Sequence, residues 1–328
     1  MRFVLRRLGF FALTLWVALT LNFLLPRLMP GNPALAVIAS HKGGVSPQAL
    51  KVLEAQFGLG QHHSLVSQYF SYLGNVATFK FGTSLTYLPG TSVAAIVRGA
   101  IPWTLGLVGV TTILAFVLGT GIGIVGAWRR GGRLDSIMPP VFVIMTVIPY
   151  FWIGLVLILV FGVKLHWLPY FNSFDITLTP GFNATFIGNV LLHSIMPAFT
   201  LLITTIGTWI LTMRNTMITT LAEDYVRMAR AKGLPGYKIM LDYAARNAIL
   251  PNLTGFAMSL GFVVGGAILI EEVFNYQGVG FMLLQAVNNT DYPLMQALFL
   301  LITVAVLAAI LVSDIATAVL DPRTRVAR

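Results

Sequence analysis

The feature that most constrains this chain is a series of long apolar stretches separated by polar ones. Crossing the hydrocarbon layer of a bilayer takes about 20 predominantly apolar residues in a helix. Six stretches are long enough, at about residues 8–26, 101–128, 137–163, 189–213, 248–270 and 294–320. Because a backbone in lipid must satisfy its own hydrogen bonds, each stretch is predicted to be helical. The sequence therefore predicts an all-α polytopic membrane protein with six transmembrane helices.

The composition excludes several other classes of protein. Charged residues make up 10% of the chain, against about 25% in a typical soluble domain, and the mean hydropathy is +0.83. The net charge of +10 fits basic cytoplasmic loops, and we expect no nucleic-acid partner. The chain has no cysteine, which excludes disulfides and thiolate metal sites.

The N-terminus begins with basic residues, as a signal peptide does. Its apolar run of about 18 residues is longer than the usual signal-peptide core, and no small-residue cleavage site follows. We therefore expect an uncleaved first membrane helix.

The basic residues divide unevenly between the polar segments on the two sides of the predicted membrane. Fifteen of the 21 fall in alternate segments: three within 2–7, three within 129–133, six within 214–246 and three within 323–328. Since cytoplasmic loops are enriched in Lys and Arg, both termini are predicted to be cytoplasmic.

The first external segment, about residues 27–100, is too long for a simple connector. Two stretches in it, SPQALKVLEAQFGL and HSLVSQYFSYLGNV, have the apolar spacing of short amphipathic helices. We therefore divide the chain into residues 1–100, with the first transmembrane helix and a small external helical segment, and residues 101–328, with the transmembrane core.

The polar segment between the fourth and fifth predicted spans has clear helix punctuation. Thr220 and Glu223 have the spacing of a capping box. Gly233 is placed to end that helix, because glycine adopts the left-handed conformation at little cost. Pro235 suits the start of a second helix, which runs to about Ala248. The pattern predicts a short helix, a tight turn and a second helix that project into the cytoplasm.

One face of the first short helix is suited to contact another protein. The helical spacing places four residues on it, Tyr225, Met228, Ala229 and Lys232. Ala229 and Ala231 are small, so a partner's surface can approach the backbone closely. The residues alone allow two interpretations, a docking element or an ordinary positively charged cytoplasmic loop.

The sequences ARAKGL (229–234) and RNAILP (246–251) resemble the EAA loop of ABC importer permeases, in the variant of the dipeptide/oligopeptide family. The distance from Gly233 to Pro251 is longer than in the general EAA pattern and is similar to that of the peptide-type branch. Arg227 stands where the general pattern has glutamate, which is another trait of that branch.

The resemblance covers nearly the whole chain. Further pieces match in the family's order, namely LRRLGFFALTL…LPRLMPGNP, FGLGQHHSLVSQYFSYLGNV, EDYVRMARAKGL, EEVFNYQGVGFMLLQAV, DYPLMQA and DIATAVLDPRTR. Asn32 stands where Asp is commoner, and GQHH stands where the family more often has Asp-Gln-Pro. Each piece is weak alone, but their order and spacing are specific.

The resemblance implies a division of labour among several polypeptides in the cell membrane of a prokaryote. The chain would be one of two similar permease subunits. Two cytoplasmic ATPase subunits would bind ATP and Mg, and an extracellular solute-binding protein would deliver the ligand. The EAA loop, about residues 214–251, would be the coupling element that inserts into an ATPase subunit. The implied coupling residues are Tyr225, Arg227, Met228, Ala229, Arg230, Ala231, Lys232, Gly233 and Leu234.

The sequence is consistent with a transport subunit that is not an enzyme and carries no cofactor. The phosphate-loop pattern G-x-x-x-x-G-K-[ST] does not occur, and GLPGYK at 233–238 has the wrong spacing. His-Glu-x-x-His is also absent. Spans two to five contain almost no ionisable residue, so they do not resemble an ion or proton relay.

Three acidic residues near the ends of the last two spans each allow two interpretations. Glu271 and Glu272 follow the fifth span. One of them could line the substrate pathway and bind the amino group of an entering peptide, or the pair could have a structural role. Asp314 lies toward the cytoplasmic end of the sixth span, where a charge costs less than at mid-bilayer, and we expect a structural pairing for it.

The substrate is less constrained than the family. Peptides are the commonest cargo of similar permeases, which also carry oligosaccharides and nickel chelates. Outside the family, a self-sufficient secondary transporter would show inverted repeats and ionisable residues in its spans, and a membrane-embedded enzyme would need a catalytic constellation. The predicted function is the permease subunit of an ATP-driven peptide importer.

Overall fold

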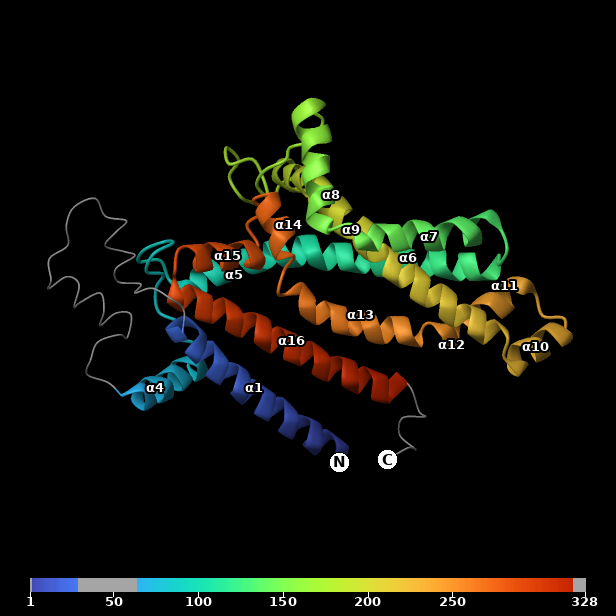
Figure 1. Cartoon of the computed structure of the whole chain (residues 1–328), viewed down its shortest axis with the longest axis horizontal. Helices are drawn as coiled ribbons and strands as arrows, with labels where there is room; N and C mark the ends of the chain where they lie inside the picture. The colour runs from blue at the N-terminus through green and yellow to red at the C-terminus, as the bar shows by residue number, and fades with distance from the viewer. Residues whose placement is uncertain (1, 29–63, 321–328) are drawn as a thin grey trace, which may run out of the picture.

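A computed structural model describes residues 2–28 and 64–320 (Figure 1). Apart from an isolated bridge between Thr83 and Ser92, the regular structure of the described residues is helical, which confirms the predicted all-α class. The helices are α1 (Arg2–Leu28), α4 (Leu65–Ala77), α5 (Val93–Thr104), α6 (Val110–Trp128), α7 (Arg133–Val147), α8 (Tyr150–Leu157), α9 (Ala184–Leu221), α10 (Asp224–Ala231), α11 (Gly236–Lys238), α12 (Arg246–Ala248), α13 (Leu250–Val263), α14 (Ile268–Val273), α15 (Val279–Asn288) and α16 (Tyr292–Leu320). The π-helical segments η1 (Leu105–Gly109), η2 (Ile158–Lys164) and η3 (Ile239–Ala245) continue neighbouring helices.

Three helical stretches of the described chain are long and apolar enough to cross a membrane. They are Val93–Trp128, which joins α5, η1 and α6, then α9, and Tyr292–Ser313 of α16. These stretches correspond to the second, fourth and sixth predicted spans. The fourth is longer than predicted, because α9 continues to Leu221.

The third predicted span is bent by 90° between α7 and α8. Ile148, at the bend, has an extended backbone (φ −74°, ψ 124°), which is the conformation favoured before a proline. The sequence predicts that Pro139, Pro140 and Pro149 bend this span, and the bend directly before Pro149 confirms that part of the prediction. Pro139 and Pro140 lie inside α7 and Pro197 lies inside α9.

The first predicted span lies within α1, which has 27 residues and is long enough to cross a membrane, whereas the fifth is shorter than a full crossing within the described residues. The apolar part of α1 is Gly9–Leu24. Helix α13 ends at Val263, and the chain then turns at Gly266, whose φ is +70°, before α14 begins. The fifth apolar stretch is thus interrupted, and the count of six spans stays a prediction.

Two glycines bring α6 and α9 into close contact. A Cβ atom on Gly119 would lie 2.6 Å from the Cβ of Trp209, and one on Gly123 would lie 2.7 Å from the carbonyl oxygen of Ile210. Small residues one helical turn apart let helix backbones approach closely in membranes. These two positions therefore join α6 and α9 along their middle.

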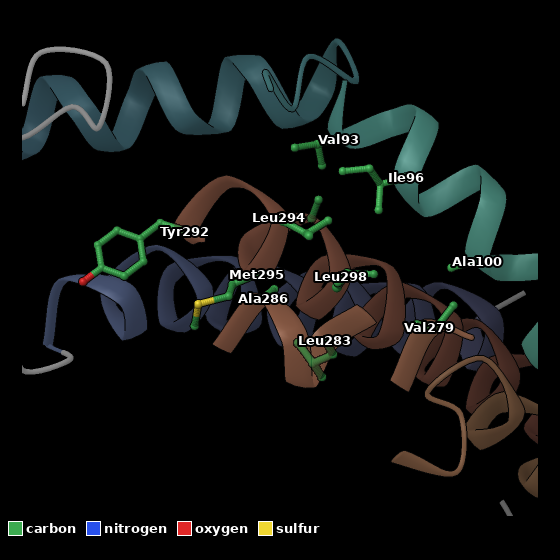
Figure 2. Close-up of a cluster of buried hydrophobic side chains, with 11 residues drawn as sticks. Val93, Ile96, Ala100, Val279, Leu283, Ala286, Tyr292, Leu294, Met295 and Leu298 are labelled. Atoms are coloured by element: carbon green, nitrogen blue, oxygen red, sulfur yellow. The ribbon is translucent and has the colours of Figure 1, made fainter. Parts of the chain in front are cut away.

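A buried apolar cluster joins α5, α15 and the start of α16 (Figure 2). Its members are Val93, Ile96, Ala100, Val279, Leu283, Ala286, Tyr292, Leu294, Met295, Ala297 and Leu298. Beside it, the fully buried carboxylate of Asp291 accepts hydrogen bonds from the Ser84 hydroxyl at 2.5 Å and from the backbone N–H groups of Leu85, Thr86 and Tyr87 at 3.1–3.2 Å. The carboxylate therefore fastens the loop before α5 to the start of α16.

Helix α4 confirms that the second of the two stretches predicted as external helices is helical, and the first, SPQALKVLEAQFGL, lies outside the described residues. The Tyr69 hydroxyl is 2.7 Å from the hydroxyl of Thr20 in α1. Asn22 of α1 donates to the Tyr72 hydroxyl at 3.1 Å and to the backbone carbonyl of Gln296 in α16 at 2.8 Å. These bonds join α4, α1 and α16.

The start of α1 and the end of α16 both point toward the end of the molecule that carries α10 and α11 (Figure 1). Helices α5 and α15 lie at the opposite end. Such an arrangement agrees with two termini on one side of the membrane. Which side that is stays a prediction.

Candidate functional site

The chain between α9 and α13 folds into two short helical pieces joined by a turn (Figure 1). Helix α10 is the first piece. The second runs from Gly236 to Ala248 and joins α11, η3 and α12. The predicted helix, turn and second helix are therefore confirmed, including the end at Ala248. We call this whole segment, residues 222–249, the paired-helix segment.

The predicted capping box at its start is wrong. Thr220 still belongs to α9, and its hydroxyl donates to the carbonyl of Thr216 at 2.8 Å. Glu223 is itself the N-cap of α10 and makes no side-chain capping bond. The reason is the length of α9, which continues about two turns past the predicted end of the fourth span and takes up Thr220.

The turn after α10 has the geometry that the sequence predicts for Gly233. Gly233 has φ +72°, and its N–H donates to the carbonyl of Arg230 at 2.9 Å. The Leu234 N–H donates to the carbonyl of Ala229 at 3.4 Å. This pair of bonds is the Schellman motif, which requires a left-handed residue and so favours glycine.

The inner face of α10 is packed against the rest of the protein. Val226 and Ala229 form a buried cluster with Ile239 of the second piece, and the partly buried side chains around it are those of Trp128, Leu221 and Leu234. Ala229 is 3% exposed. The expectation that Ala229 shares an exposed face with Tyr225 and Met228 is therefore wrong, because the helix needs this side to pack against its own protein.

The outer face of α10 and the turn carry most of the predicted coupling residues. Seven of the nine are exposed, namely Tyr225, Arg227, Met228, Arg230, Ala231, Lys232 and Gly233, whereas Leu234 is half-buried. Met228 is 60% exposed and Tyr225 is 39% exposed. The ion pair between Arg227 and Asp224, at 3.7 Å, lies in solvent and contributes little to stability. That these residues contact a partner stays a prediction.

Two side-chain contacts hold α10 in place. The Asn247 amide donates to the Tyr225 hydroxyl at 3.0 Å, which connects α10 to the end of the second piece. The Arg230 guanidinium lies 5.9 Å from the ring centre of Trp128, the last residue of α6, at a distance suited to a cation–π interaction.

The second helical piece packs closely against α6 and α9. Three of its alanines, Ala244, Ala245 and Ala248, form a buried cluster with Ala127 of α6 and with Met213 and Met217 of α9. Just beyond it, the buried Asn252 of α13 donates to the Thr120 hydroxyl at 3.0 Å and to the Trp209 carbonyl at 3.1 Å. The paired-helix segment is therefore attached to three of the predicted spans.

Glu271, the first of the two predicted pathway acids, is fully buried and hydrogen-bonded on both oxygens. Oε1 accepts from the Thr104 hydroxyl at 2.8 Å, and Oε2 accepts from the Phe281 N–H at 3.0 Å. Gly278 lies so close that a Cβ there would be 2.5 Å from the carboxyl carbon. This carboxylate joins α5, α14 and α15, which is the structural interpretation of Glu271.

Glu272 is half-buried, and its Oε2 atom has no hydrogen-bond partner among the described residues. The structure does not bring it together with Glu271 in one site, since the Glu271 carboxylate is enclosed. A substrate-pathway role for Glu272 stays a prediction. The Asp314 side chain lies outside the described residues. Within the described part of the chain, His, Asp and Glu side chains form no group of three that could hold a metal ion.

Sequence reasoning missed Trp128 and Leu221 as parts of this site. Each is the last residue of a long helix, α6 and α9 respectively, and each packs on both buried clusters under the paired-helix segment. A tryptophan at the end of an apolar run, followed by Arg129 and Arg130, indicates only a membrane-interface position. The long-range contact with α10 left no pattern in the sequence.

Comparison with known proteins identifies the family. Residues 119–326 match the family model described as "Binding-protein-dependent transport system inner membrane component". The di/tripeptide transport system permease protein of Pseudomonas aeruginosa is 33% identical over 98% of each chain. The dipeptide transport system permease protein of Lactococcus lactis is 32% identical over 99% of each chain, and the oligopeptide transport system permease protein of Bacillus subtilis is 32% identical over 92% of each chain. The chain belongs to the family of binding-protein-dependent transport system inner membrane components and is a multi-pass membrane transport subunit.

Proposed function

We propose that this chain is the membrane-spanning permease subunit of an ATP-driven peptide importer, and that the outer face of α10 docks into a cytoplasmic ATPase subunit. The chain itself carries no cofactor. ATP and Mg bind to two partner ATPase subunits, a second homologous permease subunit completes the membrane pathway, and an extracellular solute-binding protein delivers the substrate. Membrane lipid covers the remaining apolar surface.

The observation that carries this proposal is the division of α10 into two unlike faces. Val226 and Ala229 are packed inside the protein, whereas Met228 is 60% exposed on the outer face. An exposed large apolar residue is unremarkable alone. Here it stands among Arg227, Arg230 and Lys232, on a helix closed by a defined turn. An apolar centre with a polar rim is the anatomy of a protein interface.

The substrate class rests on the relatives. The three relatives reported above are described as permeases for di/tripeptides, dipeptides and oligopeptides. Their similarity to this chain spans almost its whole length. A peptide is therefore the best-supported cargo. Oligosaccharides and nickel chelates are the alternatives that an uptake experiment distinguishes.

The docking proposal is tested by replacing Met228 in the assembled transporter. M228E places a charge at the centre of the proposed interface, and desolvating it on docking is costly. We expect the ATPase subunits to be lost from the detergent-extracted complex, while the permease still inserts. M228L keeps the apolar volume, and we expect it to retain the ATPase subunits.

The proposal would be overturned if M228E copurified with ATPase subunits as well as M228L does. It would also be overturned if the purified chain moved solute into vesicles with no nucleotide-hydrolysing partner. For the substrate, competition between a labelled dipeptide and unlabelled oligopeptide, oligosaccharide or nickel chelate identifies the cargo. Competition by peptides alone is the expected result.

A further inference from the structure

We propose that Trp128 is the positioning residue through which movement of the paired-helix segment reaches α6. The inference deepens the proposed function and rests on it, because it concerns what happens after an ATPase subunit engages α10. Nothing in the sequence separates Trp128 from an ordinary aromatic residue at a membrane interface. The contacts of Trp128 in the fold do distinguish it from such a residue.

The partly buried Trp128 side chain packs against both buried clusters under the paired-helix segment. One cluster is centred on Val226, Ala229 and Ile239. The other joins the alanines of the second piece to α9 and to Ala127 of α6. Leu221 also packs on both clusters, but it ends α9, which is continuous with α10 through two residues of chain. Trp128 comes from a helix far away in the sequence, so its side chain supplies a link that the backbone does not.

Both helical pieces of the proposed moving part lie against the indole. Arg230 of α10 lies 5.9 Å from its ring centre. Gly236, at the start of the second piece, lies beside the indole, since a Cβ there would be in van der Waals contact with the Trp128 Cζ2 atom at 3.4 Å. A shift of either helical piece therefore meets the indole directly.

On the N-terminal side of Trp128, α6 is in close contact with α9 at Gly119 and Gly123. Packed protein interiors have low compressibility and transmit strain, and coupling between distant sites is carried by contiguous packed groups. A displacement of α10 that pushes on Trp128 is thus carried into α6, and from there into the α6–α9 pair.

The test compares W128A, W128F and W128L with the wild type in the complete transporter. V125A is the matched control, because Val125 lies one turn earlier on α6 and is 41% exposed. Two quantities are measured. One is the amount of ATPase subunit that copurifies, and the other is the number of labelled dipeptides imported per ATP hydrolysed when the liganded binding protein is supplied.

We expect all four variants to keep their ATPase subunits. Imported dipeptide per ATP should fall by roughly tenfold in W128A, fall less in W128L, and stay near the wild-type value in W128F and V125A. A misfolded or undocked permease would instead lose the copurifying ATPase, so the retained subunit separates transmission from a merely structural role.

The inference is overturned if W128A imports dipeptide per ATP as the wild type does, or if W128A loses its ATPase subunits while W128F and W128L remain fully coupled. Should W128A fail to accumulate, the same decision rests on W128L, whose full coupling would refute the proposal. Failure of the docking proposal looks different, because M228E would then keep its ATPase subunits whatever Trp128 does.

Discussion

Gly233 is the residue whose backbone conformation most restricts what can replace it. It has φ +72°, and no other group lies within 4 Å of the position that a Cβ would take. A side chain there meets no steric clash, so the cost is conformational, about 1–2 kcal/mol for a residue in the left-handed region. For a β-branched residue the cost is greater. The Schellman turn therefore depends on backbone freedom alone.

We predict that G233V lowers peptide uptake per ATP hydrolysed while the protein remains in the membrane, and that G233A does so to a smaller extent. Uptake into vesicles of the complete transporter measures both. G99A is the control, since Gly99 has open space at its Cβ position and lies inside α5 without a positive φ. Normal uptake by G233V would contradict the role of this turn.

Glu271 shows the opposite kind of constraint, in which the side chain is specified by its partners. The carboxylate accepts from the Thr104 hydroxyl and the Phe281 N–H. Thr104 also accepts a bond from the Val279 N–H at 2.7 Å. Removing the carboxylate leaves buried donors without an acceptor, and each such donor costs about 1–3 kcal/mol.

We therefore predict that E271A lowers the thermal unfolding midpoint of the purified chain in detergent. E271Q should lower it less, because the amide oxygen still accepts one bond. E272A is the matched control, since one oxygen of Glu272 has no partner among the described residues, and we expect a small change. Equal midpoints for E271A and E272A would refute the structural role of Glu271.

At the scale of helices, the contact between α6 and α9 decides whether the transmembrane core forms. Gly119 and Gly123 face α9, whereas Gly121 on the same helix has no group within 4 Å of its Cβ position. Adding bulk at a close backbone contact forces the helices apart, at about 1–3 kcal/mol or more. The same addition on the exposed side does not.

We predict that G123L abolishes recovery of monodisperse protein and that G121L preserves it. Size-exclusion chromatography of the detergent-extracted chain measures the difference. The two substitutions add the same side chain to the same helix two residues apart, so helix propensity and hydropathy are matched. Comparable recovery of G123L and G121L would show that the close α6–α9 contact does not hold the core together.

The helices themselves could be predicted from the sequence, because apolar run length and glycine and proline punctuation are local signals. The turn at Gly233 and the bend at Pro149 were predicted for this reason. The capping box failed because α9 extended through Thr220, and tertiary packing decided where that helix ended. The inward position of Ala229 followed from contacts with Ile239 and Trp128, which no local pattern records.

Long-range polar contacts could not be predicted from the sequence either. Asp291 accepts bonds from residues more than 200 positions earlier in the chain, although its place just before α16 resembles an ordinary helix start. Asn252 connects α13 to α6 and α9 through bonds spanning 132 and 43 positions. In both cases the residue type fits a simple local role, and only the fold shows which distant group it serves.

At the scale of the whole molecule, the long apolar spans of the described chain bury only a minority of their residues within the protein. In the most apolar windows of the three long spans, the buried shares are 28%, 22% and 22%. A single chain therefore does not enclose its own transmembrane helices, and lipid or further subunits must cover the remainder. This is expected of one component of a larger membrane assembly, as the family description indicates.

The hydrogen bond between Asn22 and Gln296 has a consequence for biosynthesis. The ribosome makes α1 first and α16 last, so the buried amide of Asn22 enters the bilayer long before its acceptor exists. During that interval the amide has its other acceptor, the Tyr72 hydroxyl of α4, but lacks the one on α16. The first helix to be synthesised is thus among the last to complete its contacts, and nascent chains that stop short of α16 lack one of the two acceptors of Asn22.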